Sequence, residues 1–219
     1  MAFDILLCFF ALTLIPVLVF RYLDPPSTPL MWIRWEQNDT HQVMPRSLDS
    51  WQTLDNISPH LLRAVIAAED QKFFSHQGFD WQAIEYAIQV NLTSDRKVGA
   101  STISMQTARN VFLWQNRTWS RKILEGYFTI LIELFWNKRR ILEVYLNVIE
   151  WGEGVYGCEK ASQLYFKRSS LNLSPVESAW MAAVLPNPRH WSSQPVPSHV
   201  QARQAKILSA MVSTRIPAK

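Results

Sequence analysis

From residue 58 onward, apolar residues recur at helical spacing, and no alternating strand pattern persists anywhere in the chain. Ser58 and Pro59 are typical of an N-cap and a first helical position, and the apolar run over 61–68 predicts a buried helix after them. Asp80 is the natural cap of a helix over 80–92. Further helices are predicted over 101–112, 119–136, 138–149, 178–185 (opened by a capping box, Ser174 with Glu177) and 198–212. Gly152, Gly154 and Gly157 mark a turn-rich segment. The sequence therefore predicts a mainly α domain.

The N-terminal segment is almost wholly apolar from residue 3 to residue 20. As a helix it would rise about 27 Å, which suffices for a bilayer core. A cleaved signal peptide would need a basic start and a small-x-small cleavage site, and neither precedes Pro25. We therefore expect a transmembrane anchor over 1–22, a linker over 23–54 that packs on the domain, and one domain over 55–219. Arg21 and Arg34 follow the span, so the positive-inside rule weakly favours a cytoplasmic body.

The chain has 219 residues, enough for one domain with a proper core. Its formal net charge of +4 fits attraction to an anionic lipid surface or an anionic substrate. Nucleic acid is disfavoured as a partner, because the basic residues lie among apolar helices and carboxylates and form no separate polar stripe. Cys8 lies inside the apolar segment and Cys158 far downstream, so we expect no intrachain disulfide.

Two carboxylates, two aromatic residues, a histidine and a glycine follow the apolar run over 61–68, in the segment 69–78. A carboxylate at this helix end, such as Glu69, loses solvation, lies at the negative end of the helix dipole and has Asp70 as a like-charged neighbour. Each effect raises its pKa, which a general base working near neutrality needs. The alternative is a solvated Glu-Asp pair at a helix end, and this segment alone favours that alternative.

Three further segments carry reactive or charged side chains. Over 99–106, a glycine, a small residue and hydroxyls would let a ligand approach the backbone, with a plain Ser/Thr N-cap as the alternative. Arg121 and Glu125 lie at i and i+4 of a helix, and one interpretation is that they simply pair with each other. The alternative is that Arg121 and Lys122 bind a pyrophosphate. Glu133 falls on the same helix face as Glu125, and we expect at least one of the two to face a polar cleft. The segment 138–147 alone has the spacing of an ordinary amphipathic helix.

Together and in this order, the four segments resemble the motifs of the peptidoglycan glycosyltransferases, the family that polymerises lipid II and forms the first module of bifunctional penicillin-binding proteins. Its patterns are Glu-Asp-x-x-Phe-x-x-His-x-Gly, Gly-Gly-Ser-Thr-Ile-x-Gln-Gln, Arg-Lys-x-x-Glu and Lys-x-x-Ile-Leu-Glu-x-Tyr-Leu-Asn, and the match covers roughly residues 55–190. The chain departs from them at Ala100 and Met105, which replace glycine and glutamine, and has Arg109 where lysine is common. A Ser-x-x-Lys match over 94–97 lacks the other transpeptidase motifs, so a monofunctional polymerase is expected.

The resemblance implies roles for the matching residues. Glu69 would take the proton from the 4-hydroxyl of the acceptor sugar, and Glu125 would be the second essential glutamate. Arg121 and Lys122 would lie near the pyrophosphate of the donor. Substrate contacts are implied for the remaining motif residues: Asp70, His76, Ser101, Thr102, Gln106, Arg109 and Lys138. For His76, the specific role that can be assigned is only structural or positioning. A divalent cation, Mg²⁺ or Mn²⁺, is a candidate cofactor, and Glu125 is its candidate ligand.

The implied reaction is an inverting transfer in which the 4-hydroxyl of an acceptor lipid II joins the reducing end of a growing glycan strand and undecaprenyl pyrophosphate leaves. The implied fold is lysozyme-like, with a larger head lobe and a smaller membrane-associated lobe. The apolar stretches 111–114 and 128–136 suit the smaller lobe, although a core helix is an equal alternative for the second.

Lipid II is polymerised on the outer face of the cytoplasmic membrane, so the resemblance places the body on the periplasmic side, against the weak charge signal. Penicillin-binding proteins and division proteins are candidate partners. Two rival functions stay open. A lysozyme-like glycan-cleaving enzyme would need neither the pair Arg121 and Lys122 nor an anchor, and a non-catalytic cell-wall scaffold would be free to lose Glu69 or Glu125.

Overall fold

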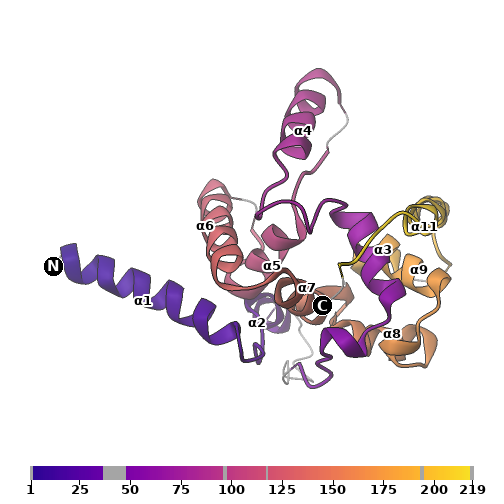
Figure 1. The fold of residues 1–219 in the computed structure, drawn as a ribbon, viewed down its shortest axis with the longest axis horizontal. Coiled ribbons are helices and arrows are strands. Elements are labelled where there is room, and N and C mark those ends of the chain that lie inside the picture. The colour runs from indigo at the N-terminus through magenta and orange to yellow at the C-terminus, as the bar shows by residue number, and fades with distance from the viewer. Residues whose placement is uncertain (1, 37–47, 96–97, 117, 193–194, 218–219) are drawn as a thin grey trace.

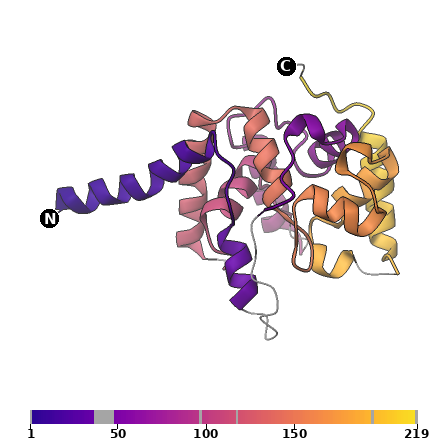
Figure 2. The same cartoon turned by 90° about the horizontal axis from the view of Figure 1, so that it is seen from below.

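The computed structural model describes residues 2–36, 48–95, 98–116, 118–192 and 195–217, and it is mainly helical, as the sequence predicts (Figure 1). One group of packed helices consists of α3 (Pro59–Glu69), α9 (Pro175–Val184) and α11 (Ser198–Ala210). A second group consists of α5 (Ile103–Phe112), α6 (Trp119–Phe135) and α7 (Lys138–Val148). Helix α4 (Trp81–Thr93) projects from the body, and α1 (Ala2–Phe20) extends away from it on another side (Figures 1 and 2).

Shorter elements complete the described part of the chain. Helix α2 (Pro29–Glu36) contacts α5 and lies within the predicted linker, of which residues 37–47 are outside the described residues. The remaining elements are α8 (Cys158–Phe166), α10 (Pro188–Trp191), the 3₁₀ turns η1 (Leu54–Asn56) and η2 (Ser170–Asn172), and the strands β1 (Glu150–Gly152) and β2 (Val155–Tyr156).

The predicted helix caps are confirmed. The Ser58 hydroxyl accepts a hydrogen bond from the backbone N–H of His60 at 3.3 Å, and the Asp80 carboxylate accepts one from Ala83 at 3.0 Å. Ser174 and Glu177 form the capping box at the start of α9. These side chains satisfy amides that have no partner within their own helices, so the starts of the helices are encoded locally.

The turn-rich segment predicted around the glycines contains a small antiparallel sheet of β1 and β2, which the sequence did not predict. The strands are three and two residues long, too short for an alternating pattern to be seen. Gly154 lies in the turn between them with φ +68°. The sheet leads directly into α8, which the sequence also did not predict.

Helix α7 is buried on nearly every side. It contacts α5, α6, α8 and η1, and seven of its residues are buried (Ile141, Leu142, Val144, Tyr145, Leu146, Asn147 and Val148). The largest fully buried side chains are Trp151, Tyr145 and Phe73, and they belong to one continuous core. The fourth motif is therefore the centre of the core as well as part of the site described below.

The transmembrane anchor expected over 1–22 is not supported: among the described residues, no helix is long and apolar enough to cross a membrane. Part of the apolar surface of α1 packs on the body. Val17 is fully buried, and the indole Nε1 of Trp136 donates to its carbonyl oxygen at 2.7 Å. The Thr13 hydroxyl shares a hydrogen bond with the Tyr127 hydroxyl at 2.9 Å.

The apolar stretches 111–114 and 128–136, assigned to a membrane-associated lobe, lie largely in the core, which agrees with the alternative for the second stretch. Val111, Leu113, Phe128 and Trp136 are buried, although Ile130 and Leu134 face outward. The exposed large apolar side chains lie instead mainly on α1, on α4 (Trp81, Tyr86, Ile88 and Leu92) and at the start of α6 (Trp119 and Ile123). Spacing alone did not separate these faces, because both kinds of helix are apolar along one side.

Gly78→Ala is expected to lower the free energy of unfolding by about 1–3 kcal/mol. Gly78 has φ +90°, a conformation that strains an alanine, and an added Cβ would lie 2.8 Å from Cγ2 of Thr129. Urea denaturation measures the effect. Gly126→Ala is the matched control, because a Cβ there meets nothing within 4 Å and an alanine inside α6 should stabilise by about 0.5–1 kcal/mol. Equal effects of the two substitutions would contradict the strain argument.

Candidate active site

Glu69 is the last residue of α3, and side chains from two other helices hold its carboxylate. Gln106 Nε2, from α5, donates to Oε2 at 2.9 Å, and Arg203 Nη2, from α11, lies 3.0 Å from Oε1. Burial raises the pKa of Glu69 above its usual value. The hydrogen bond from Gln106 and the charges of Arg203 and Arg109 oppose this rise, and the charge of Asp70 adds to it. The predicted direction of the shift is confirmed, with burial as its main cause.

The amide of Gln106 has a defined orientation. Its Nε2 donates to Glu69, while its Oε1 accepts a hydrogen bond from the Tyr145 hydroxyl at 3.3 Å. Tyr145 is fully buried, and burial raises its pKa, so the hydroxyl keeps its proton and remains a donor. Tyr145, Gln106 and Glu69 therefore form one hydrogen-bonded chain from the core helix α7 to the carboxylate. Met105, which replaces a glutamine of the second motif, directly precedes Gln106 in the chain. Its apolar side chain is buried.

Asp70 and His76 bind each other and tie two segments together. Both Asp70 carboxylate oxygens lie within 3.0 Å of His76 Nε2, and Oδ2 also accepts from the backbone N–H of Ile103 at 3.0 Å. His76 Nδ1 accepts from the N–H of Gly78 at 3.1 Å, which assigns the imidazole proton to Nε2. The pair therefore fixes the loop after α3 against the start of α5. These contacts give His76 a positioning role, and substrate binding by Asp70 stays a prediction.

The second motif forms the N-terminus of α5. The Thr102 hydroxyl caps the helix by accepting from Met105 N–H at 3.1 Å, and it donates to the carbonyl of Gly78 at 2.6 Å. The N-cap alternative for the second motif is therefore present at Thr102. The same hydroxyl also connects the start of α5 to Gly78, the last residue of the first motif. Ser101 is half-buried beside it.

The Glu133 carboxylate binds side chains from the second and fourth motifs. Its Oε1 accepts hydrogen bonds from Ser104 Oγ and, at 2.7 Å, from Lys138 Nζ. Lys138 Nζ also lies 4.6 Å from the centroid of the Phe73 ring. The structure therefore places Lys138 in contact with Glu133 and with Phe73 of the first motif, and gives Glu133 protein partners.

Glu125 is almost completely buried in α6, and each of its carboxylate oxygens pairs with a cation. Oε2 accepts from Arg121 Nη1 and Oε1 from Lys122 Nζ. The pairing alternative for the third motif is therefore present in the structure. Because both oxygens are engaged by cations, Glu125 does not fit the role of a Mg²⁺ or Mn²⁺ ligand in this arrangement. Among the described residues, no group of three or more His, Cys, Asp and Glu side chains could hold a metal ion.

Arg109 is the electrostatic link between the two glutamates. Its guanidinium is buried, and this burial lowers its pKa, while the charges of Glu125 and Glu69 both oppose that shift. Its Nε has no hydrogen-bond partner within the described part of the chain, and the same is true of Nε in Arg203. Two buried guanidinium donors thus remain available near Glu69, which suits binding of an anionic group.

Arg203 is the site residue that the sequence analysis missed. It lies on α11, 134 positions after Glu69 and outside all four motifs. A signal was present, because Arg203 shares a helix face with the buried Val200 and Ile207. A cation on the buried face of a helix needs a partner, and here the partner is Glu69.

Arg203→Gln is expected to move the acidic limb of the pH profile of kcat/KM to higher pH. A base works only when deprotonated, so in the role predicted for Glu69 activity falls as the pH drops through the pKa of this residue. The charge of Arg203 lowers that pKa, and its removal therefore raises it further. Steady-state kinetics over a pH series measure the shift. Arg203→Lys, which keeps the charge, serves as the control and should restore most of the wild-type profile. An unmoved limb in Arg203→Gln would contradict the assignment of the base to Glu69.

Comparisons with known proteins show the family to which the chain belongs. A family model described as transglycosylase matches residues 37–212. A protein of Bdellovibrio bacteriovorus named biosynthetic peptidoglycan transglycosylase is 51% identical over 211 residues, covering 96% of this chain and 84% of the relative. Proteins with the same name from Rhodospirillum centenum and Bacteroides thetaiotaomicron are 48% and 47% identical, over 94% and 95% of this chain and 87% and 84% of the relatives. The chain belongs to the transglycosylase family.

Proposed function

We propose that this protein polymerises lipid II into linear glycan strands by inverting glycosyl transfer. One observation carries the proposal: Glu69, whose side chain is 14% exposed and whose pKa is raised, is linked electrostatically through Arg109 to the buried Glu125, which pairs with two cations. A base on one side and a concentration of positive charge on the other are what a transfer from a pyrophosphate donor needs. The names of the relatives support the same substrate class.

In the proposed step, Glu69 takes the proton from the 4-hydroxyl of the acceptor sugar as that oxygen attacks the anomeric carbon of the donor. The bond from this carbon to the pyrophosphate breaks, and its electron pair leaves with the pyrophosphate. Attack from the face opposite the leaving group inverts the configuration. Negative charge grows on the pyrophosphate during the step, so fixed cations stabilise the transition state more than the ground state.

Arg109 and Lys122 are the proposed partners of the pyrophosphate. The Nε–H of Arg109 has no hydrogen-bond partner within the described part of the chain. The Lys122 side chain is 41% exposed, whereas the Arg121 side chain is only 9% exposed. Arg121 also donates from Nε to the carbonyl of Asn116 at 2.7 Å. Lys122 can therefore reach a ligand while Arg121 keeps Glu125 in place.

We further propose that the body lies on the periplasmic face of the cytoplasmic membrane, with α1 and α4 against lipid. The exposed apolar side chains of both helices support lipid contact. Fusions of reporters to the C-terminus test the side: alkaline phosphatase, active outside the cytoplasm, should be active, and a cytoplasm-only reporter should be silent. The opposite pattern would overturn the assignment.

The polymerase proposal is tested by incubating the detergent-solubilised full chain with labelled lipid II. Polymer made by the wild type, with release of undecaprenyl pyrophosphate, is the expected result. Shortening of preformed glycan without polymer would instead indicate the lysozyme-like cleaving enzyme. If neither lipid II nor glycan changes, the scaffold function is favoured.

A further inference from the structure

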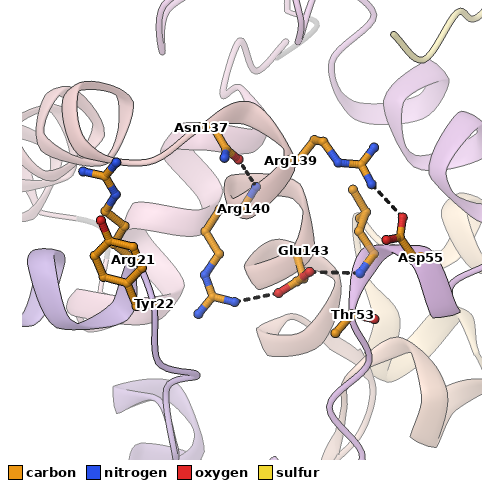
Figure 3. Close-up of a pocket in the computed structure, with 9 residues that line it drawn as sticks. Arg21, Tyr22, Thr53, Asp55, Asn137, Arg139, Arg140 and Glu143 are labelled. Atoms are coloured by element: carbon orange, nitrogen blue, oxygen red, sulfur yellow. Dashed lines mark hydrogen bonds and ion pairs between the residues drawn. The ribbon is translucent and has the colours of Figure 1, made fainter. Parts of the chain in front are cut away.

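A cavity of about 500 Å³ opens where the end of α1, the turn η1 and the start of α7 meet, and residues outside the candidate active site line it (Figure 3). Its charged lining consists of three guanidiniums, from Arg21, Arg139 and Arg140, and two carboxylates, from Asp55 and Glu143. The hydroxyl-bearing side chains of Tyr22 and Thr53 also line it. The lining thus carries one more positive than negative charge and several neutral donors.

Arg140 and Glu143 build the wall of this cavity and are fully engaged. Arg140 pairs with Glu143 at 2.6 Å and with Asp24 at 2.8 Å, and it donates to the carbonyls of Phe20 and Leu23 at the end of α1. The second oxygen of Glu143 accepts from the backbone N–H of Leu54. These contacts fix the end of α1 and the turn η1 on α7, so the cavity is formed by the fold itself.

Arg21 and Arg139 remain able to bind a ligand. Arg139 pairs with Asp55 at 2.8 Å, but their side chains are 35% and 55% exposed, and such surface pairs are weak. Arg21 is exposed, and its guanidinium carbon lies 5.1 Å from the centroid of the Tyr22 ring. Contact with a ring face leaves the N–H edges of a guanidinium open to an anion. Arg21 and Arg139 therefore line the cavity from either side of Arg140, each with N–H groups that can meet an anion bound there (Figure 3).

The position of the cavity indicates what this anion is. Leu18, Val19 and Leu23 lie beside Arg21 in the chain and are exposed, as is most of the apolar surface of α1 before them. An amphiphile with an anionic head and apolar tails matches this arrangement, because its head would meet the guanidiniums and its tails the exposed side of α1. We propose that the cavity binds the phosphate of an anionic phospholipid headgroup, with Arg21 and Arg139 as its charged donors. This proposal does not rest on the polymerase activity.

The experiment measures binding of the full chain to vesicles by co-sedimentation. The vesicles contain phosphatidylcholine alone or phosphatidylcholine with an equal amount of phosphatidylglycerol. The test variant is Arg21→Gln/Arg139→Gln. The matched control is Arg63→Gln/Arg168→Gln, which removes the same charge from α3 and from the surface pair of Arg168 with Glu177. Asp55→Asn is a third variant that releases Arg139 from its surface pair.

Affinity for the anionic vesicles should fall roughly tenfold to thirtyfold in the test variant and less than about threefold in the control, and it should rise in Asp55→Asn. Equal losses in the test and control variants would overturn the proposal in favour of diffuse charge attraction. A competition arm distinguishes the sources of phosphate: short-chain phosphatidylglycerol should displace the vesicles, whereas inorganic phosphate at the same concentration should not. Equal displacement by inorganic phosphate would mean a free-phosphate site and would also overturn it.

Discussion

Glu69→Gln is expected to lower kcat for glycan polymerisation by about 10²–10⁴-fold, the usual contribution of a general base. The amide keeps the size of the side chain but cannot take the proton of the acceptor hydroxyl. Gln106, Arg203 and the burial that raises the pKa of Glu69 all act on this one carboxylate. Polymer formation from labelled lipid II under saturating substrate measures kcat, and KM should change far less.

Two controls separate this loss from a folding defect. The free energy of unfolding of Glu69→Gln should stay within about 1 kcal/mol of the wild type, because the amide preserves volume and polarity. Glu153→Gln is the matched surface control: its side chain is 73% exposed and pairs with Arg189, so activity should be unchanged. Wild-type polymerisation by a folded Glu69→Gln variant would refute the role of Glu69.

Glu125→Gln is expected to lower both activity and stability. It leaves Arg121, whose side chain is 9% exposed, without its carboxylate, and breaking a buried pair in this way costs about 3 kcal/mol. The loss of the carboxylate also releases Lys122 from its place near the proposed pyrophosphate site. We expect kcat to fall by about 10²–10³-fold. Urea denaturation and the lipid II assay measure the two effects separately.

The double variant Arg121→Gln/Glu125→Gln distinguishes a structural pair from a functional one. With both charges of the pair removed, Arg121 no longer leaves an unpaired buried ion, so stability should recover part of the way to the wild-type value. The recovery stays incomplete because Glu125 also supports the charge of the buried Arg109 guanidinium. Activity should stay low, because nothing then positions Lys122. If activity recovers together with stability, Glu125 serves only as the partner of Arg121, and its second role is wrong.

The sequence predicted the local part of this structure well. The helices and their caps followed from apolar spacing and from residues such as Ser58, Asp80 and Ser174, because these signals act within a few residues of one another. The raised pKa of Glu69 was also predicted, since an apolar helix that ends at a carboxylate buries it. The strands β1 and β2 were missed because they are too short to show a period.

The sequence by itself determined which residues carry charge, where most of the longer helices form and which family the motifs resemble. Only the tertiary structure decided which of these side chains meet. It brought Arg203 to Glu69 across 134 positions, joined Tyr145 to Gln106, and turned the apolar faces around 111–114 and 128–136 inward while leaving those of α4 exposed. The physical reason is that caps and periodicity depend on neighbours in the chain. Contacts between distant helices depend on how the whole core packs, and no local pattern encodes that.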